Sequence, residues 1–321
     1  MINRALRTKL NKQEKCIAYL EKLRWNGKVS CSYCGSSKTI PLKSEYRHHC
    51  YKCERNFSVT VGTIFEHSRY PLTDWFHMIW LVLNAKQGIS AMQLHRTLEC
   101  SYKTAWLTAM KIRCAMIDDC IELQNIVEMD EAYVGGKPRK RTNNSTASLS
   151  TVTTVKRGRG TKKVPVVGIV ERKGKVVLKV MEKINAANLT KMLKDSIKES
   201  NTIVITDEYR PYKKFDDFIQ HLTIDHSKKY SEGIVHTNTI EGFWSIVKNS
   251  IRGQYIVLSR KYLPLYLVQA QYIYNRRENN GNDLFEEFIR RALTDEKCML
   301  NYKPVMPVDS IVYKPKAKAK C

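Results

Sequence analysis

The sequence predicts an α/β fold: a catalytic domain built on a mixed sheet with helices, preceded by a small zinc ribbon and a helical helix-turn-helix domain. Three observations support this prediction. After Gln124, β-branched apolar runs alternate with one helical segment. Earlier in the chain, two Cys-x2-Cys pairs stand in a turn-rich stretch. Between these two regions the apolar residues recur with helical periodicity.

The catalytic domain is expected to contain three strands, a helix and a further strand. This order predicts a mixed sheet with helical cover. Between the first two strands, residues 137–163 are rich in Lys, Arg, Ser and Thr and are expected to form a mobile basic insertion. The expected strands are Ile126–Val134, Val164–Glu171, Val176–Val180 and Ile203–Thr206, and the expected helix is Ala186–Glu199.

Composition and periodicity divide the chain into five parts. Thr73 or Asp74 is expected to cap the first helix of the third part, Trp75–Ala85. The parts are a basic N-terminal helix at 1–28, a zinc ribbon at 29–62, a helix-turn-helix DNA-binding region at 63–122, the catalytic domain at 123–292 and a basic tail at 293–321.

The charge balance points to a polyanionic partner. Lys and Arg total 55 against 31 Asp and Glu, a formal net charge of +24, and basic side chains gain affinity for nucleic acid by releasing counterions from phosphates. Charge alone does not distinguish DNA from RNA or an anionic membrane. The most apolar run, Trp75–Leu83, is shorter than the roughly 20 residues that span a bilayer, and Met1–Lys12 lacks the apolar core of a secretory signal. We therefore expect an intracellular protein without a membrane anchor.

Four cysteines have the spacing of a zinc ribbon. Fifteen residues separate the two pairs, and four thiolates complete a closed, structural tetrahedral site for Zn²⁺. Gly35 supplies the freedom that the first knuckle needs. The alternatives are two reduced pairs without metal, or ligation by His48 or His49 in place of a cysteine. The expected ligands are Cys31, Cys34, Cys50 and Cys53.

Two short helices around a three-residue break indicate a helix-turn-helix. The first runs from Ser90 to Leu98 and the second begins at Tyr102. An ordinary helical hairpin is the alternative. One face of the second helix is expected to be buried, at Ala105, Ala109, Ile112 and Met116. The basic side chains left available to phosphates or base edges are Lys103, Lys111 and Arg113.

Three carboxylates form the candidate nuclease site. Asp130 lies near the end of the first expected strand, and Asp207 directly follows the last one. Glu241 lies on a helix whose buried stripe is expected to be Ile240, Trp244, Val247 and Ile251, with Asn238, Glu241, Ser245 and Lys248 on the opposite face.

Phosphoryl transfer by two divalent ions needs hard carboxylate ligands, and three acids from two strands and one helix suit Mg²⁺ or Mn²⁺. In this interpretation Lys248 faces the scissile phosphate or its neighbour. The residue types leave alternatives open at each position. Glu131 and Glu208 compete with their neighbouring aspartates, and Asn238 with Glu241 also fits a capping box.

The motifs together resemble a known family. Asp-Glu-Ala-Tyr-Val-Gly-Gly-Lys at 130–137 and His-Thr-Asn-Thr-Ile-Glu-Gly-Phe-Trp-Ser at 236–245 are similar to those of bacterial insertion-sequence transposases that combine a zinc ribbon, a helix-turn-helix and a DDE domain. These proteins, with the ISXO2-like transposase domain, are relatives of the Merlin transposases. The resemblance extends in order over nearly the whole chain, from Cys31 to Arg277.

The resemblance implies an RNase H-like catalytic domain with Asp130, Asp207 and Glu241 as the catalytic, metal-binding acids. It implies metal-dependent cleavage at the terminal inverted repeats and transfer of the freed ends to target DNA, by a homodimer or higher oligomer. Such a protein works on DNA in the bacterial cytoplasm, or in the nucleus of a eukaryotic host. One departure is Glu208, where a small residue such as Gly is expected. The residues expected to contact DNA are Lys103, Lys111, Arg113, Asn238, Lys248 and Arg252.

Overall fold

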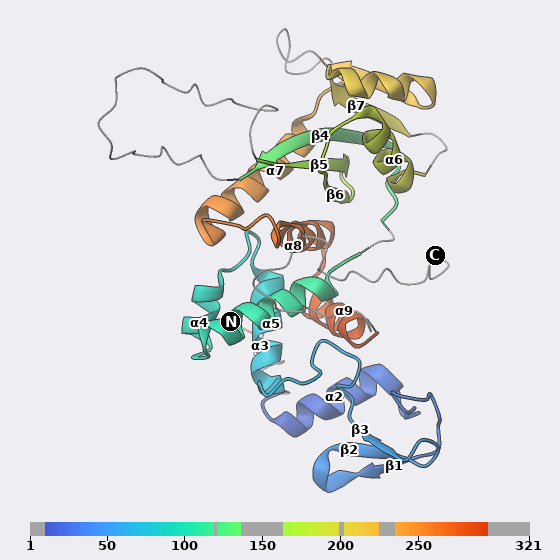
Figure 1. Cartoon of the computed structure of the whole chain (residues 1–321), viewed down its shortest axis with the longest axis vertical. Coiled ribbons are helices and arrows are strands. Elements are labelled where there is room, and N and C mark those ends of the chain that lie inside the picture. Colours follow the sequence, from blue (N-terminus) through green and yellow to red (C-terminus); the bar gives the residue numbers. More distant parts are fainter. Residues whose placement is uncertain (1–9, 119–120, 136–162, 199–201, 225–234, 295–321) are drawn as a thin grey trace, which may run out of the picture. The chain divides into compact units, whose positions relative to one another are not determined.

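The computed structural model describes residues 10–118, 121–135, 163–198, 202–224 and 235–294 (Figure 1). Nearly all of the basic insertion expected at 137–163 and of the tail expected at 293–321 lies outside these residues. The described chain forms two compact units, one from residues up to 118 together with 265–294, and the other from residues 121–264. Residues 265–292, which the sequence assigns to the catalytic domain, group with the N-terminal segment.

The first unit contains a small sheet and six helices among its described residues. The antiparallel sheet has the order β1-β2-β3. A short 3-10 turn, η1 (Lys43–Glu45), joins its first two strands. The strands are β1 (Thr39–Leu42), β2 (Arg47–Cys50) and β3 (Arg55–Phe57). The helices are α2 (Gln13–Trp25), α3 (Leu72–Asn84), α4 (Ala91–Thr97), α5 (Tyr102–Ala115), α8 (Leu263–Asn275) and α9 (Gly281–Thr294).

The start of α3 differs from its prediction. The helix begins at Leu72, directly after Pro71, and neither Thr73 nor Asp74 is its N-cap. The amide of Leu72, an otherwise unsatisfied donor of the first turn, donates to the side-chain oxygen of Gln13 at 2.9 Å. A helix 59 positions earlier in the chain therefore supplies the cap, which no local motif could indicate.

Helices α4 and α5 are each capped by the serine that precedes them. The hydroxyl of Ser90 accepts from the Gln93 amide at 3.1 Å, and that of Ser101 accepts from the Thr104 amide at 3.1 Å. The intervening turn contains Glu99 with φ of 50°. The buried face of α5 is confirmed, with exposures of 0–1% at Ala105, Ala109, Ile112 and Met116.

The second unit is built on a five-stranded sheet in the order β6-β5-β4-β7-β8 (Figure 1). β4, β5 and β6 are successively antiparallel, whereas β7 is parallel to both β4 and β8. This order with these directions is the RNase H-like arrangement. The mixed sheet and RNase H-like fold are confirmed; the sequence patterns had not indicated β8. The strands are β4 (Ile126–Val134), β5 (Val164–Glu171), β6 (Val176–Val180), β7 (Ile203–Asp207) and β8 (Gln220–Ile224).

The two faces of this sheet pack against different helices. On one face, α6 (Ala186–Ser196) and the 3-10 segment η3 (Arg210–Asp217) enclose an apolar core that includes Val127, Met129 and Val204. On the other face lies α7 (Asn238–Ser250), which continues into the π-helical segment η4 (Ile251–Tyr255). Since side chains alternate along a strand, Glu128 and Asp130 point to the α7 face.

Helix α7 approaches the sheet at a glycine. A Cβ atom on Gly168 would lie 2.8 Å from Trp244 and 3.0 Å from Ile240, both buried on α7. Gly168 is also the direct cross-strand partner of Asp130. The missing side chain thus lets α7 lie close to the strand pair that carries the first acid. The described residues include no helix that is long and apolar enough to cross a bilayer.

Candidate active site

The register of two parallel strands brings Asp130 and Asp207 together. Glu128 on β4 pairs with Ile205 on β7, so two residues further along each strand Asp130 lies beside Asp207 on the α7 face. Oxygens of Asp130, Glu131 and Asp207 all lie within 4.8 Å of one another. The Asp207 carboxylate also accepts from the Tyr209 amide at 3.1 Å, which fixes its orientation.

Asp130 and its neighbour Glu131 have different partners, although an oxygen of each lies within 4.8 Å of the other. Glu131 points to the opposite face, where its carboxylate accepts a hydrogen bond of 2.8 Å from the hydroxyl of Tyr212 on η3. Burial, with a further contribution from Glu131, raises the pKa of Tyr212 and keeps this phenol protonated as a donor. Of these two adjacent acids, Asp130 is the one that faces α7.

Glu241 lies in the first turn of α7 and is exposed. Its carboxylate accepts from the hydroxyl of Thr237 at 3.1 Å. Thr237, not Asn238, is the N-cap residue, and its side chain makes no capping hydrogen bond. Asn238 and Glu241 therefore do not form the capping box that was the alternative for this pair. Glu208, the departure from the family pattern, is exposed.

The acids depend on one another electrostatically. Burial raises the pKa of the Asp130 carboxyl to about 7, and the charges of Glu131, Asp207 and Glu241 add to the effect. Although Glu241 lies outside the group of oxygens within 4.8 Å, it is near enough to raise this pKa. A cluster of carboxylates on two adjacent strands is a donor set that fits hard divalent cations.

The raised pKa predicts an unusual pH dependence of stability. The unfolded Asp130 carboxyl ionises near pH 4, whereas the folded one keeps its proton until about pH 7. Between these values the folded state binds the extra proton, so the metal-free protein loses stability as pH rises. We expect its thermal midpoint to fall between pH 5 and pH 8, by roughly 2–6 °C.

Calorimetry of metal-free protein across this pH range measures the effect. Asp130→Asn is the control and should flatten the dependence, because it removes the titrating group. Added Mg²⁺ should raise the thermal midpoint more at pH 8 than at pH 5. A wild-type midpoint that rises steadily from pH 5 to pH 8 contradicts the prediction.

A buried glutamate holds the N-terminus of α7. Glu128 is 0% exposed, and its carboxylate accepts from the amides of Thr239 and Ile240 at 2.8 and 3.0 Å, and from the Thr239 hydroxyl at 2.9 Å. The Nε of Arg172 donates to it at 2.7 Å, and the same guanidinium donates to the carbonyl and Nδ1 of His236 at 2.9 and 3.0 Å. Glu128, Arg172, His236 and Thr239 are called the α7 clamp below.

The α7 clamp was not predicted from the sequence. A carboxylate satisfies the free amides of a first helical turn and interacts favourably with the helix dipole, so the clamp fixes where α7 begins. Glu128 is two residues before Asp130 on the same face of β4, so one strand orients one acid and anchors the helix that carries Glu241. The sequence signal that could have indicated the clamp is Glu128, a charged residue within the apolar run of β4.

The residues expected to contact DNA occupy different surroundings. Asn238, Lys248 and Arg252 are exposed along α7 and η4, and Lys103 is exposed at the start of α5. Burial lowers the pKa of Lys111, whose ammonium donates to the Glu66 carbonyl at 3.3 Å.

Arg113 differs from its expectation. Its side chain is 2% exposed, its Nε donates to Gln269 at 2.7 Å and its guanidinium lies 4.2 Å from the Tyr266 ring centroid. The guanidinium therefore packs inside the first unit and is not available to phosphates. The helical period alone placed Arg113 beside the exposed face of α5. Its contacts with Gln269 and Tyr266 on α8 instead bury the side chain.

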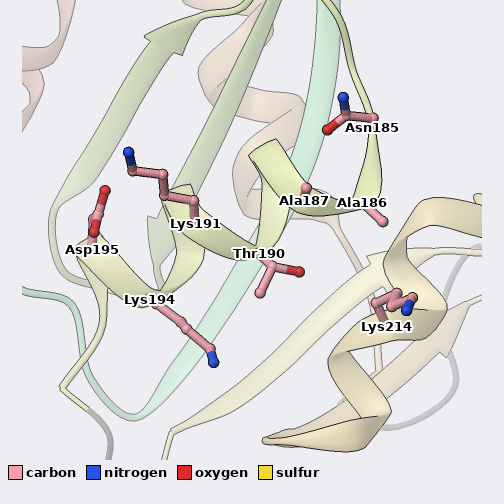
Figure 2. Close-up of a pocket in the computed structure, with 8 residues that line it drawn as sticks. All are labelled: Asn185, Ala186, Ala187, Thr190, Lys191, Lys194, Asp195 and Lys214. Atoms are coloured by element: carbon pink, nitrogen blue, oxygen red, sulfur yellow. The ribbon is translucent and has the colours of Figure 1, made fainter.

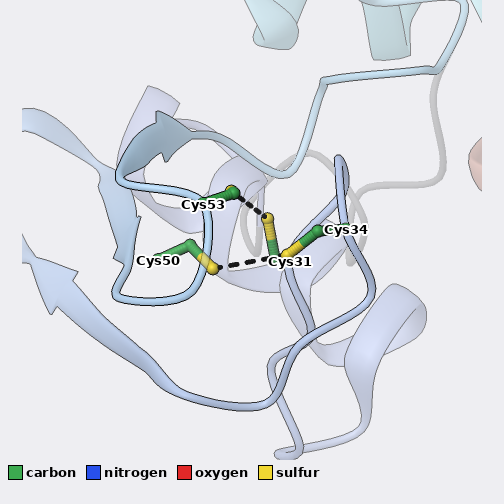
Figure 3. Close-up of side chains that lie close together, drawn as sticks. All are labelled: Cys31, Cys34, Cys50 and Cys53. Carbon is green, nitrogen blue, oxygen red and sulfur yellow. Dashed lines mark hydrogen bonds between the residues drawn. The ribbon is translucent and has the colours of Figure 1, made fainter.

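The four expected zinc ligands converge (Figure 3). The sulfurs of Cys31 and Cys53 are 3.7 Å apart and those of Cys34 and Cys50 are 3.6 Å apart. Four sulfurs bound tetrahedrally to zinc at about 2.3 Å lie roughly 3.8 Å from each other, so the cluster fits Zn²⁺. Gly35 has φ of 70°, as the first knuckle requires.

A separate hollow of about 720 Å³ lies between α6 and η3 (Figure 2). Lys191, Lys194 and Lys214 lie around it together with Asp195. The Lys194 ammonium packs 4.5 Å from the Phe218 ring centroid. The hollow contains none of the candidate catalytic acids.

Comparison with known proteins identifies both modules. Residues 122–275 match the family model described as the ISXO2-like transposase domain, and residues 11–56 match the transposase zinc-ribbon domain. An uncharacterized protein in transposable element ISH50 of Halobacterium salinarum (strain ATCC 700922 / JCM 11081 / NRC-1) is 31% identical over 242 residues, covering 71% of this chain and 80% of that protein.

Solved structures of Mos1 complexes match this chain with low TM-scores. The Mos1 strand transfer complex has a TM-score of 0.28 with 13% identity, and the Mos1 transposase paired-end complex with the left transposon end has a TM-score of 0.30 with 15% identity. Each alignment covers 72% of this chain and 81% of the Mos1 chain. The family assignment depends on the sequence matches. The chain belongs to the ISXO2-like transposases, the zinc-ribbon DDE transposases of insertion sequences.

Proposed function

We propose that this transposase binds the terminal inverted repeats of its element, cleaves DNA strands at their ends and transfers them to target DNA. Asp130, Asp207 and Glu241 are its catalytic acids. The observation that carries the proposal is the register of β4 and β7, which brings two of the acids together on the sheet face that carries α7. The third acid is in the first turn of that helix.

The three carboxylates would hold Mg²⁺ or Mn²⁺, with Glu131 close enough to contribute an oxygen. Bound divalent ions would lower the pKa of the attacking water or hydroxyl, and they would neutralise negative charge at the leaving oxygen. The chain's own contribution is orientation: the Tyr209 amide orients Asp207, and the α7 clamp anchors the helix of Glu241. Exposed Lys248, two turns beyond Glu241 on the same face, would neutralise a DNA phosphate.

DNA recognition is assigned to the ribbon and to α4 and α5. The two capped helices around a tight turn fit a helix-turn-helix, in which the second helix enters the major groove. Lys103 is exposed on the first turn of α5, the part of a recognition helix that contacts bases and phosphates. Two transposon ends must be joined, so we assign the active state to a homodimer or higher oligomer on DNA.

A cleavage assay tests the proposed function. Purified protein is incubated with a labelled duplex that carries the element's terminal repeat and flanking sequence, with Mg²⁺ or Mn²⁺, and products are resolved on denaturing gels. Wild type should cut at the repeat end and join the end to a target plasmid, whereas Asp207→Asn should bind the duplex without cutting. Wild type that binds but never cuts would identify a DNA-binding regulator instead.

Removal of two ribbon cysteines should abolish metal binding by this module. The double variant Cys31→Ser, Cys34→Ser leaves two thiolates, too few for a closed tetrahedral site. We expect zinc to fall from about one ion per chain to none by elemental analysis, with weaker binding to the terminal repeat. Ser32→Ala, between the same cysteines, is the matched control and should retain zinc. Retention of zinc by the double variant defeats the assignment.

A further inference from the structure

Two aliphatic side chains stand in solvent directly after the helix of Glu241. Ile256 is 75% exposed and Val257 is 79% exposed, the largest exposures among the large hydrophobic residues of the described chain. Both follow η4, the π-helical continuation of α7. Adjacent aliphatic residues with this exposure are costly in water unless a partner covers them.

The backbone presents this pair in a constrained turn. Ile256 has φ of 60° and ψ of −57°, a region that β-branched residues avoid. Two hydrogen bonds of 2.6 Å hold the turn, from the Ile256 amide to the Ile251 carbonyl and from the Val257 amide to the Tyr255 carbonyl. Strain of this kind persists where the surrounding structure imposes it, and it concentrates at functional sites.

The surroundings of the pair are basic. Residues 242–264 contain four cationic side chains and no Asp or Glu. An aliphatic pair among cations matches the apolar wedges that DNA-binding proteins insert between base steps while basic side chains hold the flanking phosphates. The cations are Lys248, Arg252, Arg260 and Lys261.

The pair follows the helical segment that carries Glu241. An exposed stripe on one face of α7 and η4 repeats at intervals of three and four residues, as helical geometry requires. Ile256 is 15 positions after Glu241, and because residues 251–255 are π-helical, the separation along the helix axis is at most about 22 Å. This length corresponds to roughly six nucleotides at 3.4 Å each along one DNA strand. The stripe consists of Asn238, Glu241, Ser245, Lys248 and Arg252.

We propose that Ile256 and Val257 form a wedge that inserts between base pairs of the DNA lying along α7, about six steps from the cleaved phosphate. The wedge unstacks one step and bends the duplex toward Lys248 and Arg252 on the exposed stripe. The inference rests on the proposed function, because it requires that DNA be cut at the acids. It adds a distortion site that is separate from the acids, the ribbon and the helix-turn-helix.

Fluorescence of 2-aminopurine tests the wedge. The probe base is moved, one position at a time, along the terminal-repeat duplex, and bound wild type should give its largest increase about six steps from the cleavage site. The double variant Ile256→Ser, Val257→Ser should lose this signal and cut about tenfold more slowly. The matched control Ile256→Val, Val257→Ile keeps an aliphatic pair and should retain both properties.

A duplex that is already unstacked shows whether the serine variant has lost only the ability to unstack bases or is generally less active. With a mismatch at the position of the fluorescence maximum, the serine variant should cut within about threefold of wild type, because the unstacking cost is removed. An equal defect on both duplexes, or a fluorescence maximum that survives in the serine variant, overturns the wedge. If sedimentation shows that the serine variant differs from wild type in oligomeric state without DNA, the pair belongs to a protein contact, and the wedge is overturned. Wild type that neither binds nor cuts the repeat refutes the proposed function itself.

Discussion

Asp130→Asn should slow strand cleavage by about 10²–10³-fold, because single groups that stabilise transition-state charge each contribute about this much. Glu131→Gln should lose far less. The two residues are adjacent on β4, but only Asp130 lies beside Asp207 on the α7 face, whereas Glu131 accepts the Tyr212 hydroxyl on the other face. Single-turnover cleavage of the terminal-repeat duplex at saturating metal ion measures both rates.

Tyr212→Phe is the matched control for Glu131→Gln. It deletes the donor to Glu131 and leaves all carboxylates in place, so both variants should show a similar, small reduction in rate if Glu131 acts through this hydrogen bond. Glu131→Gln that is as inactive as Asp130→Asn, while Tyr212→Phe stays active, contradicts the assignment. In that case Glu131 would be a direct ligand, as its distance to the other two acids permits.

Glu128→Ala should both destabilise the catalytic unit and inactivate it. The substitution leaves the Arg172 cation and the amides of Thr239 and Ile240 without their buried acceptor, and breaking a buried ion pair costs about 3–5 kcal/mol. We expect a decrease of this size in the free energy of unfolding of the 121–264 unit. Urea denaturation, followed by the fluorescence of Trp244 on α7, measures it.

Hydrogen exchange distinguishes a loosened α7 from general instability. In Glu128→Ala, the amides of Thr239 and Ile240 should exchange much faster than in wild type under native conditions, while amides in β5 and β6 change less. Glu171→Gln is the control, since Glu171 accepts an exposed hydrogen bond of 3.1 Å from Asn125 in the same unit. Unchanged exchange at the start of α7, with normal cleavage, would show that the clamp does not position Glu241.

Much of the architecture is encoded in local patterns. The bounds of β4, β5 and β6 agree with those expected from runs of β-branched residues, and the expected last strand differs from β7 by one residue. The two Cys-x2-Cys pairs indicated a cluster that does converge. These features are predictable because strand period, helical period and knuckle spacing depend on residues close together in the chain.

Other features are determined only by contacts between distant segments. Gln13 determines where α3 begins, and Gln269, 156 positions away, helps to hold Arg113 in the interior. The edge strand β8 lacks a clear apolar alternation and forms because β7 offers it a parallel partner.

The site shows the same division. The sequence by itself determined the acidic candidates and the helix on which Glu241 lies, through strand ends, helical period and motif. The residue types left Asp130 and Glu131 as alternatives, the family resemblance favoured Asp130, and neither gave a role to Glu128. Only the tertiary structure gives Asp130 and Glu131 different surroundings, because α7 packs on one side of β4 and Tyr212 lies on the other.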